Sequence, residues 1–189
     1  PYEDLINKWH LEKKDKDNEK SVPIKPITFW IENTTPYELR PLIKNAVLAW
    51  NIAFEEAGFI DAIEVKIQPD DADWSAGDIR YNVLRWTSSP NPPFGGYGPS
   101  FTNPRTGEIL GADIMLEWIY LTNRVRYSEI FENQEIREND FCHNSLIKQE
   151  NRIFGKLATE ALDLNENEIS RLYEEDLYQL ILHEVGHTL

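Results

Sequence analysis

Two histidines near the end of the chain, His183 and His187, are spaced for metal binding, and Glu184 follows the first of them. Residues four apart on a helix lie one above the other on the same face, so both imidazoles can reach one metal ion while Glu184 sits beside it. Neutral imidazole nitrogens suit Zn²⁺, and a catalytic zinc site keeps a position open for water. The pattern H-E-x-x-H therefore predicts a zinc site with His183 and His187 as ligands and Glu184 as the catalytic base. The alternative is that both histidines are ordinary solvated residues of a helix.

The residues around this motif narrow the prediction. The run His183–Leu189 (HEVGHTL) resembles the start of the metzincin signature H-E-x-x-H-x-x-G-x-x-H, and most of all its matrixin form H-E-[FIV]-G-H-[ST]-L-G-L-x-H. The resemblance implies a third zinc ligand, a histidine that would lie beyond residue 189. We therefore expect the piece 1–189 to bind zinc weakly and to be inactive, because a catalytic zinc site needs three protein ligands. A gluzincin, with a glutamate ligand on a later helix, is the alternative among zinc peptidases.

Composition fits one globular domain that does not bind nucleic acid. The chain has 189 residues, 41% of them hydrophobic and 12% aromatic, which is enough for one core. Its net charge of −14 would repel phosphate backbones, and no run of Lys and Arg compensates. No stretch approaches the roughly 18 apolar residues of a membrane span. The start at Pro1 shows neither a methionine nor a signal-peptide pattern, so we interpret both ends as boundaries inside a longer protein.

The first part of the chain alternates strand and helix patterns. In residues 1–22, Ile6–Leu11 alternates as a half-buried strand and Lys13–Lys20 is charged enough to be an exposed loop. Pro26–Ile31 is rich in β-forming residues and predicts a central strand. Thr35–Gly58 predicts a helix with a capping box, a proline at its first position and a terminal glycine, although Pro41 conflicts with so early a start.

Two further strands follow, with an acidic loop between them. Ile63–Ile67 alternates, and Asp78–Trp86 offers the next strand. The carboxylates of Asp70–Asp78 could supply oxygen ligands for a structural calcium ion, but the ligand order of an EF-hand is missing. The alternative is a plain turn in which the aspartates cap backbone amides.

A proline- and glycine-rich stretch leads into a predicted hairpin. Tyr97–Thr102 and Ile109–Leu116 are its strands, with Asn103–Gly107 as the turn. Proline and glycine are typical of a sheet edge, where unpaired backbone groups can accept an extended peptide. A solvated edge that binds nothing is the alternative. In the metzincin plan, the edge strand above the zinc helix runs antiparallel to the bound substrate. That resemblance makes Gly96, Tyr97, Gly98, Ser100 and Phe101 the candidate substrate-binding residues.

The chain resembles the catalytic region of a family of large bacterial zinc-dependent metalloproteases over about residues 9–118 and 177–189. The resemblance rests on FWIENTTP at 29–36, QPDDADW at 68–74, GDIRYN at 77–82, SPNPPFGGYGPS at 89–100 and the terminal motif. It implies a matrixin-like fold, an exported enzyme (periplasmic, cell-surface or extracellular) and a peptide or protein substrate.

Residues 119–176 depart from the compact matrixin pattern. Their charged, mostly helical character predicts a helical insertion between the sheet region, 23–118, and the zinc helix, 177–189. Apolar residues from Ile169 onwards keep helical spacing into the motif. Cys142 and His143 are adjacent, so their side chains diverge, and we interpret them as a buried cysteine and a surface histidine.

These observations predict an α/β (α+β) fold of the metzincin type. A mixed twisted sheet would be backed by the Thr35–Gly58 helix and faced by the HExxH helix. The predicted function is zinc-dependent peptide-bond hydrolysis, with water activated by zinc and Glu184 as general base and acid. The alternative from another class is a non-catalytic module, derived from a metalloprotease, that binds a peptide or a glycan.

Overall fold

The computed structural model describes residues 5–89, 95–118 and 166–189. Within these ranges, a six-stranded mixed sheet packs against helices, which confirms an α/β fold with a mixed sheet. Residues 119–165 of the predicted helical insertion, with Cys142 and His143, lie outside the described residues.

The sheet has the strand order β2-β1-β3-β6-β4, with β5 also paired to β6. Its strands are β1 (Ile27–Ile31), β2 (Ile63–Ile67), β3 (Asn82–Thr87), β4 (Gly96–Tyr97), β5 (Ser100–Thr102) and β6 (Ile109–Glu117). β2, β1, β3 and β6 are parallel to one another, and β4 and β5 run antiparallel along β6. The predicted interior strand at 26–31 and the strand at 63–67 are therefore confirmed.

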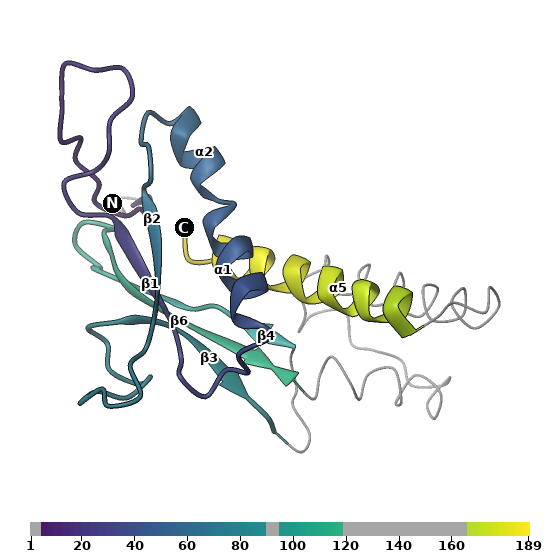
Figure 1. Cartoon of the computed structure of the whole chain (residues 1–189). Coiled ribbons are helices and arrows are strands. Elements are labelled where there is room, and N and C mark those ends of the chain that lie inside the picture. Colours follow the sequence, from purple (N-terminus) through teal and green to yellow (C-terminus); the bar gives the residue numbers. More distant parts are fainter. Residues whose placement is uncertain (1–4, 90–94, 119–165) are drawn as a thin grey trace, which may run out of the picture.

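The core lies between the sheet and the helices α1 (Arg40–Leu48) and α5 (Glu166–Gly186), while the short helix α2 (Asn51–Glu56) follows α1 (Figure 1). Strand residues alternate between the two faces of a sheet, so every second residue of β1 is buried. The buried apolar side chains of the strands and helices form one cluster: Ile27, Phe29, Ile31, Ile43, Ala46, Val47, Ile63, Leu84, Ala112, Ile114, Leu116, Leu177, Ile181 and Val185.

The predicted helix Thr35–Gly58 starts too early. Regular structure begins at Arg40 and is interrupted between Leu48 and Asn51, and Thr35 makes no capping bond. Pro41 lies in the first turn of α1, where its missing N–H is harmless, but its ring opposes a helix that begins a turn earlier. The predicted glycine stop is confirmed, because Gly58 has φ +90° and Phe59 N–H donates to Phe54 O at 2.8 Å.

Two predicted strands are also shorter in the structure. The segment Asp78–Trp86 becomes regular only at Asn82, because the Asp78 carboxylate accepts the Arg80 N–H at 3.0 Å and holds a turn there. The segment Ile6–Leu11 forms a single bridge, in which Lys8 N–H donates to Gly107 O at 3.0 Å and Ile109 N–H to Lys8 O at 2.8 Å. Trp9 and Leu11 pack against the core instead of extending this pairing.

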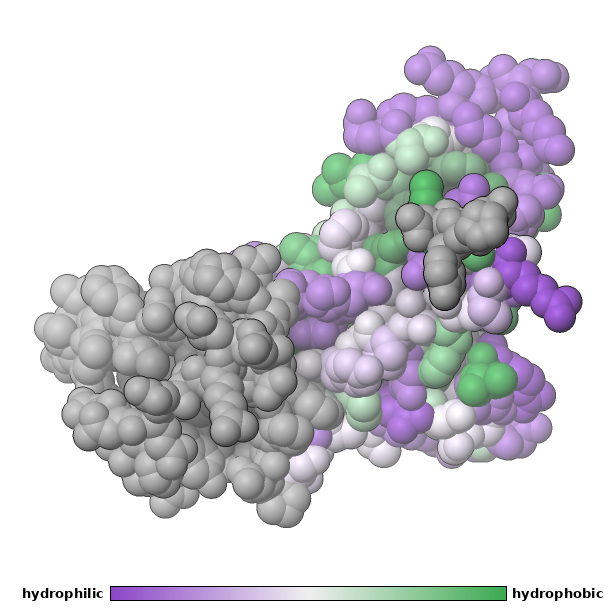
Figure 2. Space-filling model, turned by 180° about the vertical axis from the view of Figure 1, so that it is seen from behind, coloured by the Kyte–Doolittle hydropathy of each residue, from purple (hydrophilic) through white to green (hydrophobic). Residues whose placement is uncertain are grey.

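The charged segment Lys13–Lys20 forms the exposed loop that its composition predicts (Figure 1). Figure 2, which views the molecule from behind, shows hydrophilic residues gathered on this projection. Among the helices in the described ranges, none combines the length and apolar character that crossing a bilayer requires, in agreement with the sequence-based expectation.

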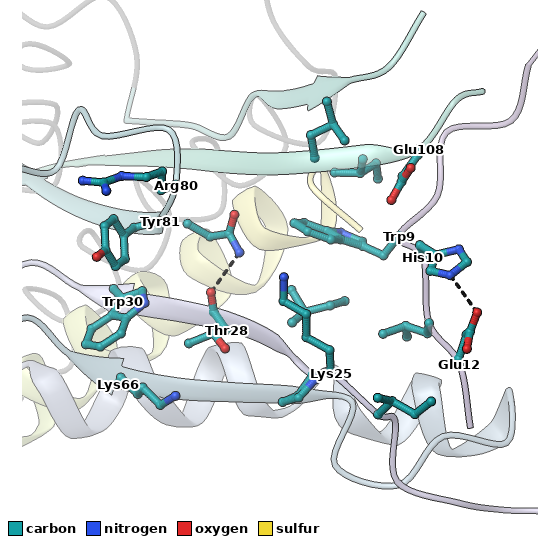
Figure 3. A pocket seen from close by; sticks show the side chains of 17 residues that line it. Trp9, His10, Glu12, Lys25, Thr28, Trp30, Lys66, Arg80, Tyr81 and Glu108 are labelled. Atoms are coloured by element: carbon teal, nitrogen blue, oxygen red, sulfur yellow. Dashed lines mark hydrogen bonds and ion pairs between the residues drawn. The ribbon is translucent and has the colours of Figure 1, made fainter. Parts of the chain in front are cut away.

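The side chain of Asn82, the first residue of β3, connects the strands on either side of β3. The Asn82 amide donates to Thr28 O at 2.8 Å and accepts the Ala112 N–H at 3.0 Å, so it joins β1 to β6. Beside it, on the sheet face away from the helices, is a cavity of about 640 Å³ into which Trp9 projects (Figure 3). The Asn82 side chain therefore connects β1 and β6 at the beginning of β3, next to this cavity.

We expect Asn82→Ala to lower the free energy of unfolding by about 1–3 kcal/mol, because two backbone groups lose their partner in a part-buried place. Urea denaturation measures this. Asn18→Ala is the control, since the Asn18 amide makes an exposed contact with Asp15, and we expect it to change stability by less than about 0.5 kcal/mol. Equal, small effects of the two substitutions would contradict the role given to Asn82.

Candidate metal centre

The two motif histidines meet at the end of α5. His183 Nε2 and His187 Nε2 are 3.0 Å apart, and the two rings are nearly perpendicular, with centroids separated by 4.6 Å. This follows from the helix period, which stacks residues i and i+4 on one face. The structure thus brings the predicted ligand pair together.

The nitrogen pair fits one zinc ion. Zn–N bonds of about 2.0–2.1 Å at a tetrahedral centre put two bound nitrogens roughly 3.3 Å apart, close to the observed separation. The described part of the chain offers no group of three or more His, Cys, Asp or Glu side chains arranged to hold a metal ion. His183 and His187 are candidate metal ligands, and a zinc ion held by them would need a further ligand.

Glu184 is buried beside the edge strand, with a relative exposure of 8%. A Cβ placed on Gly96 of β4 would be 2.5 Å from Glu184 Cγ, and one placed on Gly98 would lie against the Glu184 backbone carbonyl, well inside van der Waals contact. At Gly98 the neighbour is backbone, so this position must be glycine for the edge strand to approach the helix this closely, whereas a Cβ at Gly96 would require the Glu184 side chain to move. The candidate catalytic carboxylate lies directly under the candidate substrate strand.

The remaining candidate substrate residues are distributed along this edge. Tyr97 in β4 pairs with Met115, Ser100 in β5 pairs with Ala112, and both pairs share one antiparallel register. Tyr97 and Phe101 are exposed, and a bulge follows Phe101. β4 contacts α5, so Gly96 and Gly98 are the candidate residues placed against the motif.

The motif is positioned by apolar packing of α5. Leu177, Ile181 and Val185 recur at helical spacing and are almost fully buried in the core. At the end of the helix, Thr188 is also fully buried, and its hydroxyl donates to Val185 O at 2.8 Å. The same helix therefore presents an apolar face to the sheet and, on another face, the histidine pair.

Glu117, which the sequence analysis did not identify, holds the segment before β4 in place by hydrogen bonds. Buried Glu117 accepts hydrogen bonds from Ser89 Oγ at 2.6 Å and Ser89 N–H at 3.0 Å, and its own N–H donates to Gly95 O at 2.9 Å. Burial alone would raise the pKa of Glu117, but the hydrogen bonds from Ser89 and Thr87 outweigh it, and the pKa is lowered. Glu117 thus holds residues 89 and 95 on either side of residues 90–94, which are outside the described ranges. A single glutamate at a strand end carries no sequence signal for this role.

In the acidic loop, the Asp78 carboxylate is paired with an arginine. Asp78 accepts hydrogen bonds from the Arg80 guanidinium, and these bonds lower the pKa of Asp78 to about 2. Trp74 in the same loop stacks on Tyr81, with ring centroids 3.8 Å apart. The contacts at Asp78 fit the turn interpretation of this loop.

Comparison of the chain with protein-family models, curated proteins and solved structures found no match.

The close approach of β4 to α5 predicts a steric penalty at Gly98. Gly98→Ala should lower the free energy of unfolding by about 1–3 kcal/mol, because the neighbouring atom is backbone and cannot rotate away. Gly111→Ala is the matched control, since a Cβ there would meet its nearest neighbour at 3.4 Å, an ordinary contact. Urea unfolding of both variants measures the difference, and a Gly98→Ala variant as stable as Gly111→Ala would refute the packing described here.

Proposed function

We propose that this chain is the catalytic region of a zinc-dependent endopeptidase. The observation that carries the proposal is the pair of Nε2 atoms 3.0 Å apart, with buried Glu184 beside them under a glycine-bearing sheet edge. A matrixin-like fold is part of the same proposal. It is supported by the antiparallel strand β4, which lies at the end of the sheet order and against the end of α5.

His183 and His187 would hold the metal through their Nε2 atoms. Bound zinc would polarise the scissile carbonyl and lower the pKa of a water molecule. Catalytic zinc sites use three protein ligands, so the proposal includes a third ligand, which the matrixin resemblance places after Leu189.

Glu184 would move the proton. Its carboxylate accepts a proton from the attacking water and then delivers it to the leaving amine, so no nucleophilic side chain is required. Its side chain is buried and lies against Gly96, where a Cβ would collide with it. Glycine at position 96, which has no Cβ, therefore leaves room for the Glu184 side chain in its observed position.

The substrate would bind along β4. One side of β4 pairs with β6, and β4 is last in the sheet order, so an extended peptide can add to its other side by main-chain hydrogen bonds. The exposed side chains of Tyr97 and Phe101 would contact the peptide. Main-chain pairing would fix the backbone of the substrate, and side-chain contacts would give selectivity.

The metal proposal predicts a defined pattern of zinc binding. In a titration against a low-affinity chromophoric chelator, the 189-residue chain should bind one Zn²⁺ weakly, and His183→Ala or His187→Ala should abolish that binding. Glu184→Gln should retain it, because Glu184 is not a ligand. In a chain that also carries the third ligand, Glu184→Gln should lower peptide cleavage by several orders of magnitude, since proton transfer and zinc activation act together.

His10→Ala is the control, because the His10 side chain is 67% exposed and contacts Glu12 away from the motif. Zinc binding that survives loss of both motif histidines would reject the site. Absence of zinc binding, together with peptide or glycan binding, would favour a non-catalytic binding module. Equal cleavage by the 189-residue chain and by a longer one would place the third ligand within residues 1–189, with His143 the first residue to test.

The substrate proposal predicts where an inhibitor lies. In a crystal structure of the zinc-loaded domain, a peptidic hydroxamate should form main-chain hydrogen bonds with residues 96–102 and run antiparallel to them. An inhibitor that binds the metal but whose peptide part leaves this edge unpaired would contradict the assignment of β4.

A further inference from the structure

Two tryptophans donate hydrogen bonds to the backbone on either side of the histidine motif. Trp50 Nε1 donates to Leu182 O at 3.0 Å, and Trp9 Nε1 donates to Thr188 O at 2.7 Å. Leu182 is the residue before His183, and Thr188 is the residue after His187. The indole N–H groups therefore bracket the motif from segments distant in the sequence.

The end of α5 needs this support. The helix ends at Gly186, so His187 lies one residue past the regular part, and the bond from His187 N–H to His183 O is long, at 3.3 Å. Carbonyls at a helix end lack intrahelical partners, and Thr188 is fully buried. Trp9 supplies the donor that the buried Thr188 carbonyl requires.

Trp50 supports the same turn by packing. A Cβ on Gly186 would lie 2.7 Å from Trp50 Cζ2, so the indole ring is in close contact with the last helical residue. Trp9 is fixed in turn by its neighbour Lys8, which pairs with Gly107 and Ile109. Figure 3 shows Trp9 projecting from the N-terminal segment into the space between β1 and β6.

We propose that Trp9 and Trp50 are positioning residues that set the separation of the two ring nitrogens by fixing the backbone before His183 and after His187. The inference rests on the proposed zinc site, and it makes the N-terminal segment a part of that site. If the last turn loosened, residue 187 would leave the face of residue 183, and the two Nε2 atoms would no longer converge.

The test compares Trp9→Phe and Trp50→Phe with Trp74→Phe in the 189-residue chain. Phenylalanine keeps an aromatic ring but loses the N–H donor, and Trp74 stacks on Tyr81 in the acidic loop. We expect Zn²⁺ to bind about two- to tenfold more weakly to each of the first two variants, the range that loss of one hydrogen bond gives, and with unchanged affinity to Trp74→Phe. Urea unfolding of the metal-free proteins separates this effect from stability.

Metal-free measurements keep the inference distinct from the proposed function. In NMR spectra of the wild-type chain, the indole protons of Trp9 and Trp50 should exchange slowly with D₂O. In Trp9→Phe, the His187 ring signals should move towards those of exposed His10. If wild type binds no Zn²⁺, the proposed function fails, and these two results alone then decide whether the indoles position the pair.

The positioning role would be overturned by variants that lose stability yet keep wild-type zinc affinity in the folded state. It would also be overturned by fast-exchanging indole protons or by unchanged His187 signals. If Trp9→Phe does not fold, Trp50→Phe tests the same claim through its own hydrogen bond.

Discussion

The contact between the backbone of β4 and the last turn of α5 is the constraint on which the proposed site depends. Glycine at positions 96 and 98 allows this contact, because a Cβ at either position would collide with Glu184. The contact buries Glu184 and places a sheet edge directly above it. Other contacts of the fold hold β4 and α5 in this position. β4 pairs with β6, and α1 packs against α5. The apolar face of α5 packs into the core against the sheet.

Local patterns predicted most of the elements that build this arrangement. The alternation of apolar and polar residues predicted both ends of β2 correctly. A run of apolar, β-forming residues predicted the ends of β1 to within one residue. The spacing of His183 and His187 predicted that they share one face of the helix, because the helix period places residues i and i+4 there. The predicted start of the first helix was wrong. Thr35 has the sequence of a helix cap, but Pro41 is compatible only with a helix that begins near it, and α1 begins at Arg40.

The contacts that sequence patterns did not reveal are long-range. The bond from Trp9 to Thr188 joins residues 179 positions apart, and the Asn82 bridge connects two strands that neither precede nor follow it directly. Glu117 gives no local signal for its bonds to Ser89. Such contacts depend on the tertiary arrangement, so the sequence indicates the chemical groups but not the side chains that hold them in place.

The central claim is that His183 and His187 hold one metal ion, and crystallography at the zinc absorption edge tests it most directly. For crystals of this chain grown with Zn²⁺, the account predicts one anomalous peak within about 2.0–2.3 Å of both Nε2 atoms, with Glu184 outside bonding distance. A peak at other residues, or none while the two Nε2 atoms stay in contact, would contradict it.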